Sequence, residues 1–281
     1  MNLEIIINDV EKAAAETVQV NEGDFVGEYG LLYCGKCGTP KQGEYKMPWG
    51  VVRPYCLCKC ATEARDKAIA EQKQIEFISS MQSTWDKWGF SFRDLQGCSF
   101  ENDDMQNPRI SQAMQKYVEN FPELKKQGQG LLLYGNVGTG KTFLAVAAAN
   151  ALITKGYPVL VTNFGSMCNI IGGTYEGKQE LYDSLNRFAL LVIDDLGAER
   201  KTEYMQEIVY NVIDSRYRAG LPMIITTNLT SDELKNPQDV TNKRIYDRVL
   251  ERCLPVEVQG KNRRHVKVKQ SFNELNSLLG L

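Results

Sequence analysis

The 281-residue sequence has a single histidine and almost no excess of charge of either sign. One histidine excludes every catalytic or metal-binding arrangement that requires two. The 33 basic and 35 acidic residues leave no overall positive field to draw the chain onto nucleic acid, so a DNA contact requires a local patch. No apolar run approaches the roughly 18 residues of a membrane-spanning helix, and the first twenty residues lack the apolar centre of a signal peptide. We therefore expect a cytoplasmic protein without a membrane association.

Cysteine, by contrast, is concentrated in one short segment. Five of the eight cysteines fall within 27 residues, and the other three stand alone. In the reducing compartment expected for this chain, such a cluster indicates metal ligands rather than disulfides. Four thiolates complete a closed tetrahedral zinc site, so one of the five is spare. The candidates are Cys34, Cys37, Cys56, Cys58 and Cys60.

The chain divides by its sequence pattern into three parts. Residues 1–84 contain the cysteine cluster and a helix predicted over Ala61–Met81, and residues 85–109 carry aromatics without a clear period and are expected to form a linker. Residues 110–281 alternate helical and strand patterns, which is typical of an α/β fold with a mainly parallel sheet buried on both faces. The predicted strands are Gly130–Tyr134, Val159–Thr162, Ala189–Ile193, Pro222–Thr226 and Leu254–Val258.

A complete G-x-x-x-x-G-K-T motif follows the first predicted strand and leads into a helix that continues with Phe143. This strand–loop–helix context is the one in which backbone N–H groups and a helix N-terminus bind phosphates. Lys141 is expected to reach the β and γ phosphates of ATP, and the Thr142 hydroxyl to bind Mg²⁺. The motif consists of Gly135, Asn136, Val137, Gly138, Thr139, Gly140, Lys141 and Thr142.

Polar side chains end two further strands. Asp194 and Asp195 follow the apolar run 190–193, at the strand end where open α/β sheets bind ligands. We expect Asp194 to hold Mg²⁺ and Asp195 to orient or deprotonate the attacking water. Asn228 follows the strand Pro222–Thr226 and can position water beside the γ-phosphate. Together with the phosphate loop, these residues predict an ATPase.

The segments GLLLYGNVGTGKTFLA, LLVIDDLGAE, IITTNL, RIYDRVLERC and GKNRR occur in this order. From about Phe100 to Arg264 the sequence resembles the DnaC/DnaI/IstB branch of AAA+ ATPases, and within it the bacterial and phage replicative helicase loaders. The resemblance implies an AAA+ P-loop NTPase domain, preceded by a small zinc-binding N-terminal module and a helical linker. Its acidic pair is Asp194–Asp195, as in this branch, where most AAA+ proteins have Asp-Glu.

The resemblance also assigns roles that the spacing alone does not. Asn228 resembles sensor 1, Arg248 the arginine finger donated to a neighbouring subunit, and Arg264 the sensor 2 arginine. Neighbouring arginines remain alternatives, Arg244 for the finger and Arg263 for the sensor. In the cysteine cluster, similarity to DnaI-type loaders favours Cys34, Cys37, Cys58 and Cys60 as zinc ligands, with Cys56 as the alternative.

These features predict an ATP-dependent protein that loads a replicative DNA helicase onto single-stranded DNA. The N-terminal module would dock on the helicase, and the AAA+ domain would form homo-oligomers. Residues 241–281 hold nine Lys/Arg against four Asp/Glu, which suits either phosphates across a subunit interface or single-stranded DNA. The alternatives are an IstB-like transposition helper ATPase, which the cysteine cluster disfavours, and a nucleotide-gated adaptor with little hydrolysis.

Overall fold

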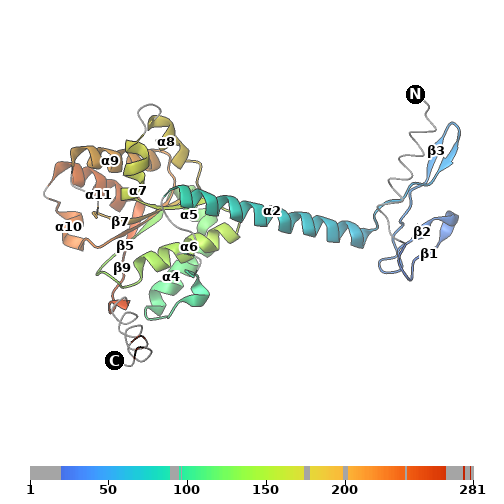
Figure 1. Ribbon diagram of the computed structural model, residues 1–281, viewed down its shortest axis with the longest axis horizontal. Helices are drawn as coiled ribbons and strands as arrows, with labels where there is room; N and C mark the ends of the chain where they lie inside the picture. Colours follow the sequence, from blue (N-terminus) through green and yellow to red (C-terminus); the bar gives the residue numbers. More distant parts are fainter. Residues whose placement is uncertain are drawn as a thin grey trace. The chain divides into compact units, whose positions relative to one another are not determined.

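The computed structural model divides the chain into two compact units, Met1–Ile75 and Glu76–Leu281 (Figure 1). The structure describes residues 20–88, 95, 97–173, 178–198, 202–237, 239–263, 275 and 279. The predicted boundaries near residues 84 and 109 lie further along the chain than this division, and they stay predictions.

The first unit is built from short antiparallel pairs. Strand β1 (Phe25–Val26) pairs with β2 (Leu32–Tyr33), and β3 (Tyr45–Met47) pairs with β4 (Gly50–Val52). The turn η1 (Glu28–Gly30) connects the first pair. Among the described residues of this unit, the buried apolar side chains are only those of Cys34 and Cys58. Such a unit needs a source of stability other than an apolar core.

The long helix α2 (Lys59–Lys87) continues across the division and extends beyond both ends of the helix predicted over Ala61–Met81. Its last turn belongs to the second unit, where Trp85 is completely buried and its Nε1 donates a hydrogen bond to the Val159 carbonyl at 2.7 Å. The predicted linker therefore begins with a residue of the core. The sequence did not indicate this, because one aromatic residue alone forms no periodic pattern. Within the described ranges, no helix is both long and apolar enough to cross a membrane.

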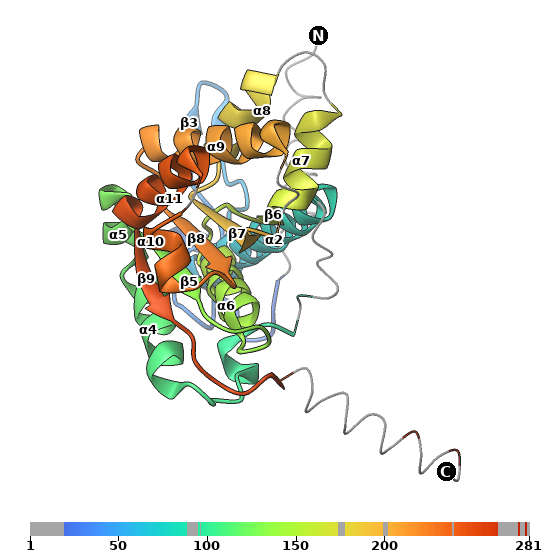
Figure 2. The same cartoon turned by 90° about the vertical axis from the view of Figure 1, so that its left-hand side faces the viewer.

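The second unit contains a five-stranded parallel sheet in the order β6-β7-β8-β5-β9 (Figure 2). This confirms the predicted α/β fold with a parallel sheet. The strand that precedes the phosphate loop, β5, lies between β8 and β9, so the carboxyl ends of all three meet at one edge. The strands are β5 (Gly130–Tyr134), β6 (Val159–Asn163), β7 (Leu190–Leu196), β8 (Met223–Thr227) and β9 (Cys253–Glu257).

Helices cover both faces of this sheet. Helix α6 packs on one face with α4 beyond it, whereas α7, α9 and α11 lie on the other (Figure 2). The strands β5 to β8 begin with apolar residues that are buried because helices cover both faces, whereas the edge strand β9 exposes Leu254 and Glu257. The helices are α4 (Pro108–Glu119), α5 (Phe121–Gln127), α6 (Lys141–Thr154), α7 (Phe164–Gly172), α8 (Lys178–Leu185), α9 (Glu203–Arg218), α10 (Ser231–Lys235) and α11 (Val240–Arg252), with the short turn η2 (Phe100–Asn102).

Among the described residues of this unit, one arginine is buried. Arg216 on α9 is 0% exposed and donates hydrogen bonds to the carbonyl oxygens of Leu185, Phe188 and Pro222. Burial lowers the pKa of its guanidinium to about 9. By binding the chain ends that enter β7 and β8, Arg216 fixes the two strands that carry the acidic pair and Asn228.

Candidate functional site

The phosphate loop turns from β5 into α6 with the lysine held inside it. Gly138 and Gly140 have φ angles of +80° and +98°, which side chains with a Cβ rarely adopt. The Lys141 side chain is buried, and its Nζ donates to the carbonyls of Gly135 at 2.8 Å and Asn136 at 2.7 Å. It also donates to Asn228 Oδ1 at 2.8 Å. The lysine thus connects the loop to the end of β8.

Asp194 and Thr142 form an oxygen cluster next to this lysine. Thr142 Oγ1 donates to Asp194 Oδ1 at 2.8 Å, and Thr226 Oγ1 donates to the same oxygen at 2.6 Å. Burial raises the pKa of the Asp194 carboxyl, and the two hydroxyl bonds oppose this shift. Mg²⁺ prefers hard oxygen ligands and is commonly bound by one or two protein oxygens together with substrate phosphates. A nearly buried carboxylate beside a hydroxyl provides such oxygens. These two side chains are therefore able to hold the metal.

Asp195 faces the cavity instead of the buried cluster. Its backbone has a φ of +56°, which is uncommon for any residue with a side chain and concentrates at functional sites. Its N–H donates to Thr226 Oγ1 at 2.9 Å, and its Oδ1 accepts from Asn228 Nδ2 at 3.3 Å. Asn228 thus lies between the lysine and this carboxylate, where an amide can orient both.

A cavity of about 470 Å³ opens at this edge of the sheet. It brings together most of the residues predicted from the sequence, and it adds two that carried no prediction, Asn102 and Asp104. Arg263, the alternative sensor, also lines it, whereas Arg264 lies outside the described residues. The remaining lining residues are Val137, Gly138, Gly140, Lys141, Thr142, Phe143, Asp195 and Asn228.

The predicted finger, Arg248, lies away from this cavity on α11. Its guanidinium is 2.5 Å from the nearly buried carboxylate of Asp214 on α9, and it stacks 4.5 Å from the Tyr210 ring centroid. Asp214 also pairs with Arg218 at 2.7 Å. Arg244, one turn earlier on α11, is exposed and has no ion pair within the described ranges. No residue of α11 lines the cavity described above.

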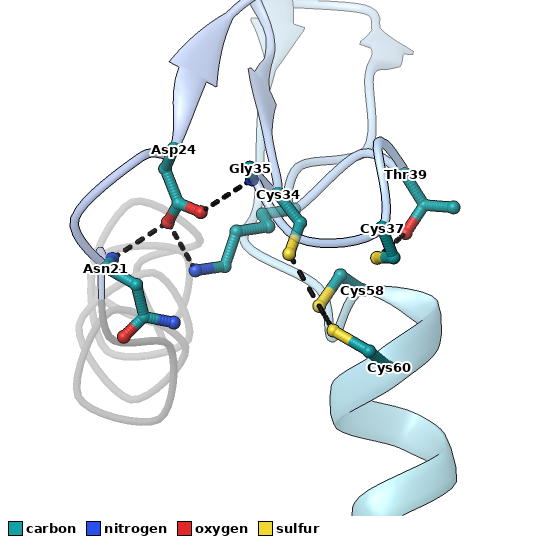
Figure 3. A network of polar contacts seen from close by, with 9 residues as sticks. Asn21, Asp24, Cys34, Gly35, Cys37, Thr39, Cys58 and Cys60 are labelled. Carbon is teal, nitrogen blue, oxygen red and sulfur yellow. Dashed lines mark hydrogen bonds and ion pairs between the residues drawn. The ribbon is translucent and has the colours of Figure 1, made fainter.

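In the first unit, four of the five clustered cysteines converge at the start of α2 (Figure 3). The sulfurs of Cys34, Cys37, Cys58 and Cys60 all lie within 4.8 Å of one another, and the Cys34–Cys60 pair is 3.7 Å apart. Ligands of a tetrahedral zinc ion are separated by about 3.8 Å when Zn–S is about 2.3 Å. Cys56 is exposed, and its sulfur faces the Pro40 carbonyl at 3.7 Å instead.

The thiols of this cluster differ in acidity. The Thr39 hydroxyl, followed by backbone N–H groups, lowers the pKa of Cys37 to about 5. Hydrogen bonding to Cys58, and then to Cys37, raises the pKa of Cys60 to about 12. Thiolates this close repel one another, so all four ionise together only when a cation balances their charge. The donor set therefore fits a metal such as zinc.

The sheet order, the phosphate loop and the strand-end carboxylates define an AAA+ P-loop nucleotide-binding domain. Residues 93–271 match the family described as "IstB-like ATP binding protein", and the chain belongs to that family.

Two curated relatives cover most of the chain. It is 30% identical over 215 residues to the replicative helicase loader DnaI of Bacillus subtilis (strain 168), covering 71% of this chain and 66% of that protein. It is 28% identical over 218 residues to the replicative helicase loader DnaC of Escherichia coli (strain K12), covering 74% and 81%. A crystal structure of DnaI superposes with a TM-score of 0.52 at 25% identity, covering 61% of this chain and 93% of the other.

Replacing Asp194 by asparagine is expected to stabilise the protein while it destroys metal-dependent nucleotide binding. The asparagine side-chain oxygen accepts the same two hydroxyl hydrogen bonds without a buried charge. The free energy of unfolding in EDTA should therefore rise by about 1 kcal/mol, and the Tm by a few degrees. Because the folded-state pKa of Asp194 lies above 3.8, the gain should appear as pH rises past 3.8 and be complete above the folded-state pKa. Thermal melts against pH, with and without MgATP, measure both effects. A lower Tm in EDTA would contradict this account of Asp194.

Proposed function

We propose that this protein uses ATP to load a replicative helicase onto single-stranded DNA. The ATP-dependent part is supported by one observation above all, the convergence of Lys141, Thr142, Asp194, Asp195 and Asn228 at one edge of the sheet. The loading part is supported by the similarity to two helicase loaders, which extends over more than two thirds of the chain.

In this proposal the chain's own residues divide the work of hydrolysis. Backbone N–H groups of 135–140 and Lys141 would hold the phosphates, and Thr142 with Asp194 would hold Mg²⁺, which would supply positive charge to the phosphates. Asp195 orients a water for attack on the γ-phosphorus and accepts its proton as the bond to ADP breaks. Asn228 keeps Asp195 and the lysine aligned. Arg248 acts on the nucleotide of a neighbouring subunit, and Arg264 is the predicted sensor 2.

The cysteine cluster of the first unit is proposed to hold one structural zinc ion. Four thiolates close the coordination sphere, so the ion has no open position for catalysis. With few buried apolar side chains, the unit would draw much of its folding free energy from metal binding.

Protein purified without added zinc is therefore expected to contain about one zinc per chain. Serine at any of Cys34, Cys37, Cys58 or Cys60 should lower this content and unfold the first unit, whereas Cys56→Ser is the matched control and should leave both unchanged. Metal analysis and the circular dichroism of each variant measure the two outcomes. Loss of zinc in Cys56→Ser, with retention in one of the other four, would contradict the proposed ligand set.

The β3–β4 hairpin of the same unit offers a docking surface for the helicase. It exposes four large apolar side chains, Tyr45, Met47, Trp49 and Val51, each at least 41% accessible to solvent. Such a concentration on so small a unit is typical of a protein–protein contact.

We expect Trp49→Ala to weaken binding to the replicative helicase by about thirtyfold, because tryptophans that become buried in an interface contribute disproportionately to the binding free energy. Ile75→Ala, which removes an equally exposed apolar side chain from α2, is the control. A titration of purified helicase, with a transposase in a parallel arm, measures both. Binding to the transposase alone would favour a transposition helper. Helicase binding with no DNA-stimulated ATP turnover would favour an adaptor.

A further inference from the structure

Arg263 lies directly against the phosphate loop, although it follows β9 and is therefore distant from the loop in the sequence. Its N–H donates to the Gly138 carbonyl at 2.9 Å. A Cβ on Gly140 would lie only 2.9 Å from Arg263 Cζ, so glycine at that position lets the guanidinium approach the start of α6. The N-terminus of this helix is where a phosphate loop holds its ligand.

The guanidinium of Arg263 already has an anionic partner, Asp104. The two are 2.9 Å apart, and both line the cavity beside Lys141 and Thr142. Asp104 belongs to the segment between η2 and α4. Asn107 fastens this segment to the chain after β9, since its Nδ2 donates to the Gln259 carbonyl at 2.6 Å. The pair is therefore formed by two segments that are fixed to each other independently of it.

Taking Arg263, the alternative sensor 2 arginine, as a ligand of the nucleotide phosphates in the proposed ATP site, we infer that Asp104 is an internal counterion that competes with these phosphates for its guanidinium. A guanidinium binds phosphate and carboxylate through the same fork of N–H donors, so it can exchange one for the other. The Asp104 carboxylate is 42% exposed and can turn toward solvent when a more highly charged triphosphate arrives. Asp104 consequently lowers the affinity for nucleotide and sets the concentration at which the site fills.

Titration of the full-length protein with fluorescent MgATP tests this competition. Asp104→Asn is expected to tighten binding about three- to tenfold, since it removes a like charge near the phosphates. Arg263→Gln is expected to weaken it about tenfold, the loss of one charge-assisted contact. In the Arg263→Gln background, Asp104→Asn should have little further effect. Glu101→Gln, an exposed carboxylate nearby that does not line the cavity, is the control and should change nothing.

The outcomes separate this inference from the proposal on which it rests. Unmodified protein that binds no MgATP would overturn both. Normal binding that Asp104→Asn leaves unchanged or weakens, in a variant whose Tm without nucleotide is unaltered, would overturn the inference alone. The inference would also be overturned if Asp104→Asn tightened MgATP binding equally in the unmodified protein and in the Arg263→Gln background. It would likewise be overturned if Arg264→Gln weakened MgATP binding and Arg263→Gln did not.

Discussion

Lys141→Ala is expected to lower the affinity for MgATP by about a hundredfold or more, and with it to abolish hydrolysis. The side chain is buried, and its ammonium lies between the loop carbonyls and Asn228. No other cation of the described ranges lies inside the loop, and Arg263, which lines the same cavity, has its own contact with the phosphates in the inference above. A hundredfold loss corresponds to about 2.7 kcal/mol, which is in the range of one desolvated charge-assisted contact. Fluorescent-nucleotide titration and phosphate release measure the two effects.

The fold should survive this substitution, because the Lys141 ammonium bonds to the loop and Asn228, and the residue is not a member of the hydrophobic core cluster. Lys126→Ala is the matched control, since that lysine is exposed and its one ion pair in the part of the chain that the structure describes is with Glu123 at 3.2 Å. Unchanged MgATP affinity in Lys141→Ala, with the far-UV circular dichroism intact, would refute the assignment of the phosphate loop.

Arg248→Ala is expected to bind MgATP normally and to lose hydrolysis by about 10³-fold or more, the effect of removing an arginine that stabilises the transferring phosphoryl group. Arg248 does not line the cavity of its own chain, so it would act on a neighbour. To do so it must leave Asp214 and the Tyr210 ring. Arg218 remains as a partner for Asp214, which reduces the free energy required for this exchange.

Mixing Arg248→Ala with Lys141→Ala should restore part of the activity, because some interfaces then pair an intact phosphate loop with an intact finger. Specific activity of the unmodified protein should also rise with its concentration. Arg244→Ala, measured in parallel, tests the alternative finger. Turnover that is linear in protein, without rescue in the mixture, would show that Arg248 serves only to hold α11 on α9.

The sequence predicted the fold class and the centre of the site because both depend on contiguous residues. The strand, glycine-rich loop and helix around Lys141 stand together in the chain, and the two carboxylates directly follow an apolar run. The strand order could not be predicted in this way, because alternation of strands and helices does not specify which strands are neighbours. Similarly, the burial of Trp85 could not be predicted, because its hydrogen-bond partner, the Val159 carbonyl, lies 74 residues further along the chain.

Pairs distant in sequence were the features missed. Asp104 and Arg263 meet across about 160 residues, and Asp214 binds Arg248 from another helix. Neither pair has a local pattern, since surface-type charges are common everywhere in the chain. For the cysteines, spacing left five candidates, and the structure brings together the four that similarity to DnaI-type loaders favoured.

The position of β5 between β8 and β9 has a consequence for synthesis on the ribosome. The partners of β5 follow it by about 90 and about 120 residues, so closing these long loops is slow and waits for the end of the chain. A nascent chain that ends at α9 already contains the complete phosphate loop but neither strand that flanks it. Asn228 and Arg263, which follow β8 and β9, are also absent from the site at that stage. Until the last strand emerges, β5 lacks both neighbours and leaves an apolar strand edge unpaired, the condition under which incomplete chains aggregate.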